Sequence, residues 1–182
     1  MVTKPQGATS AAAAGSPYRC AGRILIIEAR FYEDIGDGLA AGAIAEIEAA
    51  GGTYQRVAVP GALEIPQVLA QAAAAGKFAG SDPAYVGAVA LGCVIRGETG
   101  HYDIVCNNAN HWLMDVAVRH AIPLGNAILT VETMAQAQER AQGGREGKGG
   151  DAARACLRMI EVKQQLSGED AQKPASRTAA GE

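Results

Sequence analysis

The chain has 182 residues, 48% of them hydrophobic, which is enough for one globular domain with a sizeable core. A formal net charge of -3 and the absence of a basic run argue against nucleic acid as a partner. No apolar stretch approaches the roughly 18 residues that a membrane span needs. The apolar run 11–14 is too short for a signal peptide. We therefore expect one cytoplasmic domain without nucleic-acid or membrane partners.

The cysteines and histidines form no recognisable metal or redox motif. None of the cysteines belongs to a C-x-x-C pair, and three lie in apolar stretches, so we interpret them as buried free thiols in a reducing cytoplasm. The histidines lack the spacing of a known metal site. The residues concerned are Cys20, Cys93, Cys106, Cys156, His101, His111 and His120. The sequence predicts neither a metal nor a redox cofactor.

The first half of the chain begins with small and polar residues, so 1–21 is expected to be a disordered tail. The continuous apolar run 23–28 predicts a strand that is buried on both faces. The helix that follows is expected to end at Gly51–Gly52, because glycine readily adopts the left-handed cap. Alternation of apolar and polar residues over 54–59 predicts an edge strand.

The second half of the chain continues this alternation of helices and strands. We expect, in order, a helix over 67–75, a buried central strand over 85–95, a helix ending near 119–120, a strand over 123–131 and a short helix over 134–142. Asp151 is expected to cap a last helix. From 167 to 182 the chain is again small and polar, and we expect a flexible tail.

Strands that alternate with helices imply a parallel sheet with right-handed crossovers. The sequence therefore predicts an α/β fold, a three-layer α/β/α sandwich around a four-stranded parallel sheet. One domain over 22–166 would contain it.

The polar turn 96–101, between the central strand and the helix after it, is the strongest candidate for a functional site. Open α/β sheets bind ligands at the carboxyl ends of their strands. Backbone N–H groups at a helix N-terminus favour anions, and Thr99 adds a hydroxyl donor. His101 suits general acid–base catalysis near neutral pH. On spacing alone, Thr99 could equally be a helix cap and His101 a solvated residue.

Further candidates follow the other strands, and each has a structural alternative. Phe31 could stack on a planar ligand or pack locally. Glu64 could bind a substrate, although satisfying a helix N-terminus is its more common role. Arg140 lies beside Glu139, and such pairs are by default solvated surface. Lys148 could bind phosphate or be a simple loop lysine.

The segment Gly36-Asp37-Gly38-Leu39-Ala40-Ala41-Gly42 looks like a dinucleotide-binding loop. That fingerprint needs its first glycine directly at the end of the first strand. Here Gly36 comes eight residues after Glu28. We expect these glycines to permit close helix packing instead of binding a nicotinamide cofactor.

Three long motifs, in order along the chain, carry a resemblance to a known family. They are Ala29-Arg30-Phe31, Val59-Pro60-Gly61-Ala62-Leu63-Glu64-Ile65-Pro66 and Leu91-Gly92-Cys93-Val94-Ile95-Arg96-Gly97-Glu98-Thr99-Gly100-His101-Tyr102-Asp103, and Glu139-Arg140-Ala141 and Gly147-Lys148-Gly149 continue the match. Together they closely resemble the lumazine synthases, which catalyse the penultimate step of riboflavin biosynthesis. The resemblance covers about residues 22–165.

The resemblance implies a flavodoxin-like three-layer fold and a defined reaction. Members of the family condense 5-amino-6-ribitylaminouracil with 3,4-dihydroxy-2-butanone 4-phosphate, and they release 6,7-dimethyl-8-ribityllumazine, phosphate and water. This chemistry requires an anion site, proton transfers and tight positioning of two substrates, without a metal or a redox cofactor.

The resemblance also implies a role for each matched residue of the site. It implies that Phe31 stacks on the pyrimidine, that Val94 and Ile95 line the ring pocket, and that the ribityl chain is held by Ala62, Leu63 and Glu64. It implies that the phosphate is bound by Glu98 and Thr99, largely through backbone N–H groups, with Arg140. His101 would shuttle protons. Asn126, Arg140 and Lys148 match positions that the adjacent chain contributes, because the family's site lies between neighbouring subunits of a pentamer. The expected partners are thus two small-molecule substrates and further copies of this chain.

Three positions depart from the family pattern. Asn126 stands where many members have an aromatic ring, Gly144 stands where a basic residue is frequent, and Tyr32 replaces a more common asparagine. Arg145 is adjacent to Gly144. These departures leave open a second hypothesis, in which the chain is a weakly active relative that serves mainly as a ligand-binding or shell-forming assembly protein.

Overall fold

The computed structural model describes residues 15–168. Its elements alternate between strands and helices along the chain, as predicted. They are β1 (Arg23–Ala29), α1 (Glu33–Ala49), β2 (Thr53–Val59), the 3-10 turn η1 (Ala62–Glu64), α2 (Ile65–Ala74), β3 (Gly87–Ile95), α3 (His101–Arg119), β4 (Leu124–Val131), α4 (Met134–Ala141), the 3-10 turn η2 (Gly144–Glu146) and α5 (Lys148–Ser167). None of the helices in this part of the chain is long and apolar enough to cross a membrane.

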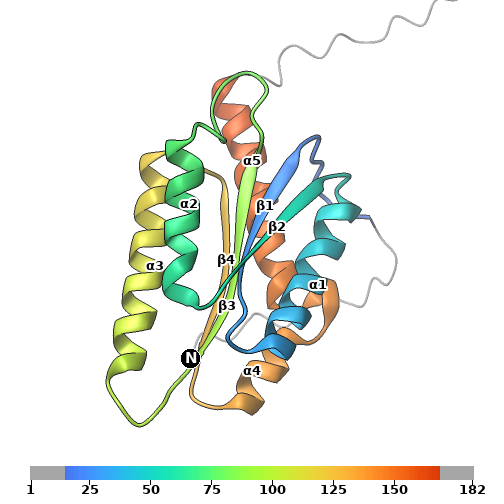
Figure 1. Cartoon of the computed structure of the whole chain (residues 1–182). Helices are drawn as coiled ribbons and strands as arrows, with labels where there is room; N and C mark the ends of the chain where they lie inside the picture. Colours follow the sequence, from blue (N-terminus) through green and yellow to red (C-terminus); the bar gives the residue numbers. More distant parts are fainter. Residues whose placement is uncertain (1–14, 169–182) are drawn as a thin grey trace, which may run out of the picture.

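The four strands form one parallel sheet in the order β2-β1-β3-β4. The apolar runs predicted to be central do lie in the middle, whereas β2 is an edge strand and keeps mostly half-buried or exposed residues. Helices α2 and α3 cover one face of the sheet, and α1, α4 and α5 cover the other (Figure 1). The predicted three-layer α/β/α architecture is therefore confirmed.

The core is divided into two apolar clusters by the sheet. Along β1, Ile24 and Ile26 pack in the cluster under α1 and α5, whereas Leu25 and Ile27 pack in the cluster under α2 and α3. All four side chains are almost fully buried. Each such burial stabilises the fold by about 1.5–3 kcal/mol. A strand with no polar face is thus the expected signature of this position in the sheet.

The predicted tails lie largely outside the described residues. Within the described part of the N-terminal segment, Cys20 is 5% exposed and packs in the core. Its backbone N–H donates to the Ala50 carbonyl at 2.9 Å. Packing of the chain therefore begins before residue 22, the boundary that the sequence predicts. At the other end, Gly168 has a φ of 75° and caps α5.

Small residues let α1 lie close to the segment that runs from α4 to α5. A Cβ on Gly38 would come within 3.0 Å of the Ala141 carbonyl oxygen, and one on Gly42 would meet the Gly144 carbonyl. Both glycines lie inside α1, well after the end of β1. The prediction that these glycines serve helix packing is therefore confirmed.

The predicted start of the last helix is wrong. Asp151 does not cap α5, because the helix begins at Lys148 and Gly147 is its N-cap. Gly149 and Gly150 lie in the first turn, where a Cβ would run into the carbonyls of Leu39 and Arg145. Two glycines cost a helix roughly 2 kcal/mol of propensity. Close packing of α5 against α1 outweighs this intrinsic preference.

Replacing Gly149 by alanine is expected to destabilise the fold by more than about 3 kcal/mol, because the obstacle is backbone and α1 must move away. Gly100→Ala is the matched control, since nothing lies within 4 Å of a Cβ there and its φ of -66° is ordinary. Urea denaturation of both variants measures the difference. Equal stabilities would contradict the packing role of Gly149.

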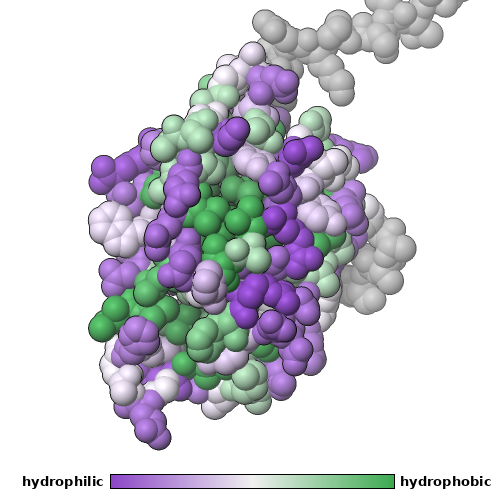
Figure 2. Space-filling view, viewed as in Figure 1, coloured by the Kyte–Doolittle hydropathy of each residue, from purple (hydrophilic) through white to green (hydrophobic). Residues whose placement is uncertain are grey.

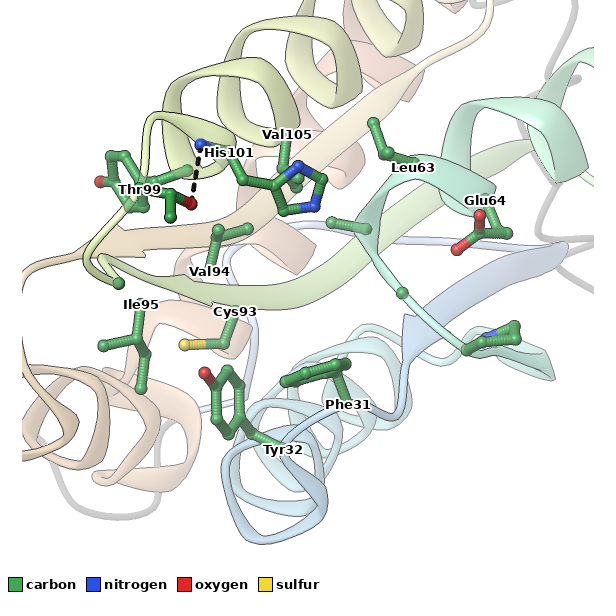
Figure 3. A pocket seen from close by; sticks show the side chains of 15 residues that line it. Phe31, Tyr32, Leu63, Glu64, Cys93, Val94, Ile95, Thr99, His101 and Val105 are labelled. Atoms are coloured by element: carbon green, nitrogen blue, oxygen red, sulfur yellow. Dashed lines mark hydrogen bonds between the residues drawn. The ribbon is translucent and has the colours of Figure 1, made fainter.

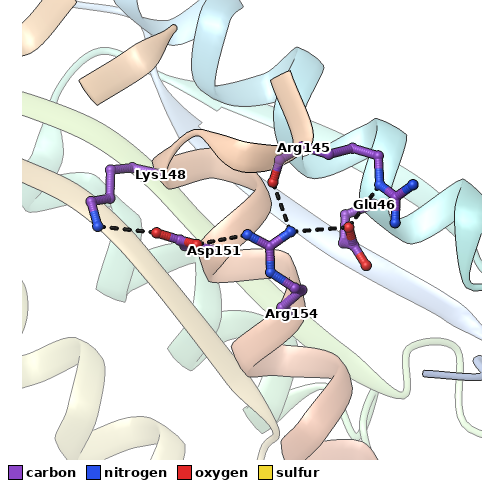
Figure 4. A network of polar contacts seen from close by, with 5 residues as sticks. All are labelled: Glu46, Arg145, Lys148, Asp151 and Arg154. Atoms are coloured by element: carbon purple, nitrogen blue, oxygen red, sulfur yellow. Dashed lines mark hydrogen bonds and ion pairs between the residues drawn. The ribbon is translucent and has the colours of Figure 1, made fainter. Parts of the chain in front are cut away.

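A network of charged side chains ties α1 to η2 and α5 (Figure 4). Glu46 on α1 is fully buried, and its Oε2 accepts hydrogen bonds from Arg145 Nε at 2.9 Å and from Arg154 Nη1 at 3.2 Å. Burial on its own would raise the pKa of Glu46, but the hydrogen bond from Arg145 and the charges of both arginines lower it overall. The carboxylate is therefore stabilised in its charged form.

Glu46→Gln is expected to lower the free energy of unfolding by about 3 kcal/mol at neutral pH, because two arginines lose their buried partner. A lowered folded-state pKa stabilises the fold fully above the ordinary glutamate pKa of about 4.3, and this stabilisation is lost as the pH falls through the folded-state value. Wild type and variant should therefore converge in acid. Glu48→Gln, at an exposed position on the same helix, is the control and should change little. A pH-independent difference would contradict this account.

Candidate active site

The polar segments that follow the strands meet at one edge of the sheet. All four strands are parallel, so the loops after β1, β2, β3 and β4 lie at the same, carboxyl, edge. The chain runs from β1 to β2 on one side and then crosses to β3 on the other side of β1. The strand order thus reverses between β1 and β3, which is where open α/β sheets form ligand crevices.

A cavity of about 420 Å³ opens at this point (Figure 3). It has the size of an ordinary small-molecule site. Eight of the twelve predicted site residues line it, namely Phe31, Ala62, Leu63, Glu64, Val94, Ile95, Thr99 and His101. The rest of its wall consists of Tyr32, Pro60, Gly61, Cys93, Gly97, Tyr102 and Val105. Residues from three separate loops and the end of β3 therefore converge as predicted.

Phe31 presents an apolar ring to this space. Phe31 is 72% exposed, and its ring contacts that of Tyr32 edge-on, with the ring centroids 4.9 Å apart. A phenylalanine that packed locally would be largely buried. The exposure favours the hypothesis that the ring stacks on a planar ligand.

Glu64 does not satisfy a helix N-terminus, although this is the more common role of a glutamate at such a position. It directly precedes α2, but its side chain makes no capping hydrogen bond. Figure 3 shows the carboxylate and the His101 imidazole on opposite sides of the same space, above Phe31. The carboxylate is thus placed to accept hydrogen bonds from hydroxyl groups of a ligand.

The turn between β3 and α3 forms one end of the cavity. His101 is the first residue of α3, and its backbone N–H donates to Thr99 Oγ1 over a long 3.4 Å. The Thr99 hydroxyl therefore makes one weak contact with the helix terminus, and it also lines the cavity. Glu98 is exposed and does not line the cavity.

Seven wall residues were not among the predicted site residues, and three of these seven lie on β3 and α3. Cys93 precedes Val94 at the end of β3, and Tyr102 and Val105 share the first turns of α3 with His101. A helical spacing of four residues from His101 was the available signal for Val105, whereas spacing gave no signal for Tyr102. Burial raises the pKa of the Cys93 thiol to about 11, so the thiol stays protonated at neutral pH and is a poor nucleophile.

Three of the four remaining predicted residues, Asn126, Arg140 and Lys148, line a different hollow, of about 350 Å³, against β4, and Glu98 lines neither space. Lys148 is the first residue of α5, and its Nζ lies 3.0 Å from Asp151 Oδ2, so it is not a loop lysine. Arg140 Nη1 lies 3.8 Å from Glu139 and donates to the Gln136 carbonyl at 3.0 Å. The two cations thus stand in a second, separate concavity of the same chain.

Two of the departures from the expected pattern have a structural explanation. The Asn126 side chain donates to Asn110 Oδ1 at 2.7 Å and accepts from the Ile128 backbone at 2.8 Å, so its amide is held against the sheet and α3. Arg145 does not replace a base at Gly144, because Arg145 bonds the buried Glu46 and does not line the hollow.

The fold and the cavity together define an α/β protein with a small-molecule site at the carboxyl edge of its parallel sheet. Among residues 15–168, no three histidine, cysteine or acidic side chains are grouped so that they could hold a metal ion. Comparison with known proteins makes this class specific. The model of the 6,7-dimethyl-8-ribityllumazine synthase family matches residues 21–164.

Curated relatives give the same result. The chain is 52% identical over 145 residues to a 6,7-dimethyl-8-ribityllumazine synthase of Nitrobacter hamburgensis. This alignment covers 80% of this chain and 88% of the relative. For the enzymes of the same name from Methylorubrum populi and Azorhizobium caulinodans, the identities are 53% over 149 residues and 52% over 161 residues. These alignments cover 82% and 88% of this chain and 87% and 95% of the relatives. The chain belongs to the 6,7-dimethyl-8-ribityllumazine synthase family.

Phe31→Ala is expected to weaken binding of a ribitylaminopyrimidine about tenfold or more, because stacking of a base on an aromatic ring contributes about 1–3 kcal/mol. Stability should hardly change, since the ring is mostly exposed. Phe78→Leu is the control, because Phe78 is the only other phenylalanine and packs on Tyr85 before β3, away from the cavity. Calorimetric titration measures the affinities. Equal affinities of wild type and Phe31→Ala would remove Phe31 from the site.

Proposed function

We propose that the chain condenses 5-amino-6-ribitylaminouracil with 3,4-dihydroxy-2-butanone 4-phosphate in the cavity at the carboxyl ends of β1 and β3. Membership of the family establishes the lumazine synthase reaction of riboflavin biosynthesis. The assignment of this cavity rests on one observation. Phe31, Glu64 and His101, which follow three different strands, line the same space.

The ribitylaminopyrimidine fits the apolar part of the cavity. Its ring stacks on Phe31 and lies against Val94 and Ile95, and its ribityl chain runs along Ala62–Glu64. The Glu64 carboxylate accepts hydrogen bonds from the ribityl hydroxyls, and it is available because it caps no helix. The second substrate then lies between the ring and the turn before α3.

The phosphate group binds at the N-terminus of α3. Backbone N–H groups there carry partial positive charge, the Thr99 hydroxyl adds a donor, and Gly97 and Gly100 leave the backbone open to a ligand. Glu98 contributes only its backbone, which agrees with its exposed side chain. Arg140 of a neighbouring copy adds the charge that this turn lacks.

The chemistry needs little more than positioning. The ring amine attacks the ketone carbonyl and loses water to form an imine, phosphate is then eliminated, and ring closure releases a second water. Holding both substrates in contact supplies most of the acceleration. His101, at the cavity wall, moves protons between the reacting atoms. Phosphate leaves as a stable anion, so His101 contributes a smaller factor than positioning.

Two copies of the chain complete each site. In one chain the cavity and the hollow lined by Asn126, Arg140 and Lys148 share no wall residue, and we infer that a neighbour brings its hollow to the cavity. A head-to-tail contact forms a ring when the rotation between copies closes, and a homo-oligomer built from pentamers is such a ring. Figure 2 shows apolar surface at the lower end of α3 and beside α2, and Ile104, Trp112 and Val118 are exposed along α3. This surface supports burial by other copies.

Two further features bear on this proposal. All four cysteines are free, which agrees with a cytoplasmic location. Asn126 offers no aromatic cover for the pyrimidine, because it has no ring, and its amide is held by Asn110. The missing aromatic ring favours weaker binding of the pyrimidine. It is the observation that supports the alternative, in which the chain serves mainly as an assembly protein.

Mixing of two inactive variants tests both the reaction and the shared site. The wild-type protein should form the lumazine from both substrates, and the absorbance of the lumazine measures the rate. Phe31→Ala damages only the cavity, and Arg140→Ala damages only the hollow. Each variant alone should lose affinity for its substrate. Dissociated and reassembled together in equal amounts, they should regain activity in about a quarter of the sites, where two intact surfaces meet.

No gain on mixing would show that each site belongs to a single chain. Product that forms no faster than in buffer, although the wild-type protein is folded and assembled, would instead favour the assembly-protein alternative.

A further inference from the structure

Arg96 occupies a central place at the cavity edge that the proposed reaction does not explain. It directly follows β3, and its backbone N–H donates to the Val131 carbonyl at the end of β4 at 2.9 Å. Its guanidinium bonds Asp103 through Nη1 and Nη2, at 3.3 and 3.2 Å, and lies 3.0 Å from Glu132 through Nε. One face of the guanidinium lies 4.0 Å from the centre of the Tyr102 ring.

This geometry argues against Arg96 as a direct phosphate ligand. Each of its three nitrogens already contacts a carboxylate, and two negative charges flank its single positive charge. The hydrogen bonds to Asp103 and Glu132 also raise the pKa of Arg96. A phosphate that approached this guanidinium would meet both carboxylates. Arg96 itself does not line the cavity, whereas Tyr102 beneath it does.

The contacts of Arg96 join three elements around a weakly supported turn. Asp103 lies in the first turn of α3, and Glu132 follows β4. Between β3 and α3, Gly97 and Gly100 have no atom within 4 Å of a Cβ position, so the turn has little packing of its own. Its side chains add one long hydrogen bond, from the His101 backbone to Thr99. The position of the turn must therefore be set from its two ends.

We propose that Arg96 is a positioning residue for the phosphate site: held by Asp103 and Glu132 and stacked on Tyr102, it fixes the turn 97–100 and the N-terminus of α3 against the end of β4. The proposal rests on the proposed function, in which this turn binds the phosphate. A forked, planar side chain is needed, because only a guanidinium can bond one carboxylate with two nitrogens and a second carboxylate with the third.

Global stability depends little on these contacts. The side chains of Arg96, Asp103 and Glu132 are all partly or mostly exposed, and ion pairs between exposed side chains stabilise a fold only slightly. Variants at the three positions should therefore fold and assemble. A loss of phosphate affinity in them would not be a consequence of unfolding.

The test compares variants of Arg96 with variants of its partners. In the assembled protein, inorganic phosphate is measured as a competitive inhibitor against the phosphorylated ketone, together with the KM of each substrate. The variants are Arg96→Ala, Arg96→Lys and the double variant Asp103→Asn with Glu132→Gln. Arg119→Ala is the matched control, because it removes an exposed ion pair to Asp115 at the opposite end of α3.

All three test variants should raise the inhibition constant of phosphate about tenfold, whereas the KM of the pyrimidine should change less than about twofold. Lysine should fail to rescue, since it keeps the charge but loses the fork. Amide exchange over 97–104 should become faster in the same variants and remain unchanged in Arg119→Ala. These results together would establish positioning.

Two results would overturn the proposal. If the double variant bound phosphate as tightly as wild type, or more tightly, while Arg96→Ala lost affinity, Arg96 would be a direct ligand. Unchanged exchange over 97–104 in Arg96→Ala would show that Arg96 does not hold the turn. The exchange measurement needs no substrate, so it decides this point even if wild type neither binds phosphate nor forms product, which would refute the proposed function instead.

Discussion

The site depends first on the parallel arrangement of the four strands. Because every strand points the same way, the loops that carry Phe31, Glu64 and His101 must all lie at one edge of the sheet. The reversal of strand order between β1 and β3 leaves a crevice there instead of a continuous row of helices. The central strands β1 and β3 can be almost entirely apolar, since they supply the frame, whereas chemistry is left to the segments that follow the strands.

Close helix packing determines the second half of the site. Gly42 and Gly149 bring α1 and α5 together with no side chain between them, and Glu46 binds the loop that carries Arg145. This packing sets where α5 begins, and therefore where Lys148 stands beside β4. The hollow that a neighbouring copy is proposed to use is thus built along the edge strand β4, with Arg140 of α4 and the start of α5. The glycines that stabilise the packing of α1 on α5 therefore also position the hollow that is proposed to bind a neighbouring copy.

Much of this structure was predictable because the physical signals are local. Continuous apolar runs identified β1 and β3, and polar residues after the strands identified the cavity wall. The start of α5 was not predictable, because two glycines argue against a helix unless the α1 backbone opposite them is known. Likewise, Glu46 in the core and Arg96 between two carboxylates depend on partners far away in sequence, so spacing gives no indication of either. Motifs that matched a family supplied the roles of single residues, which periodicity could not.

The most direct test of a site shared between copies is an experimental structure of the assembled protein with the ribitylaminopyrimidine and inorganic phosphate bound. The account predicts the ring on Phe31, the ribityl chain along Glu64 and the phosphate at the turn 97–100, with Arg140 of a neighbouring copy within reach of the phosphate. A pyrimidine bound elsewhere, or a phosphate whose only arginine partner is Arg96 of the same chain, would contradict it.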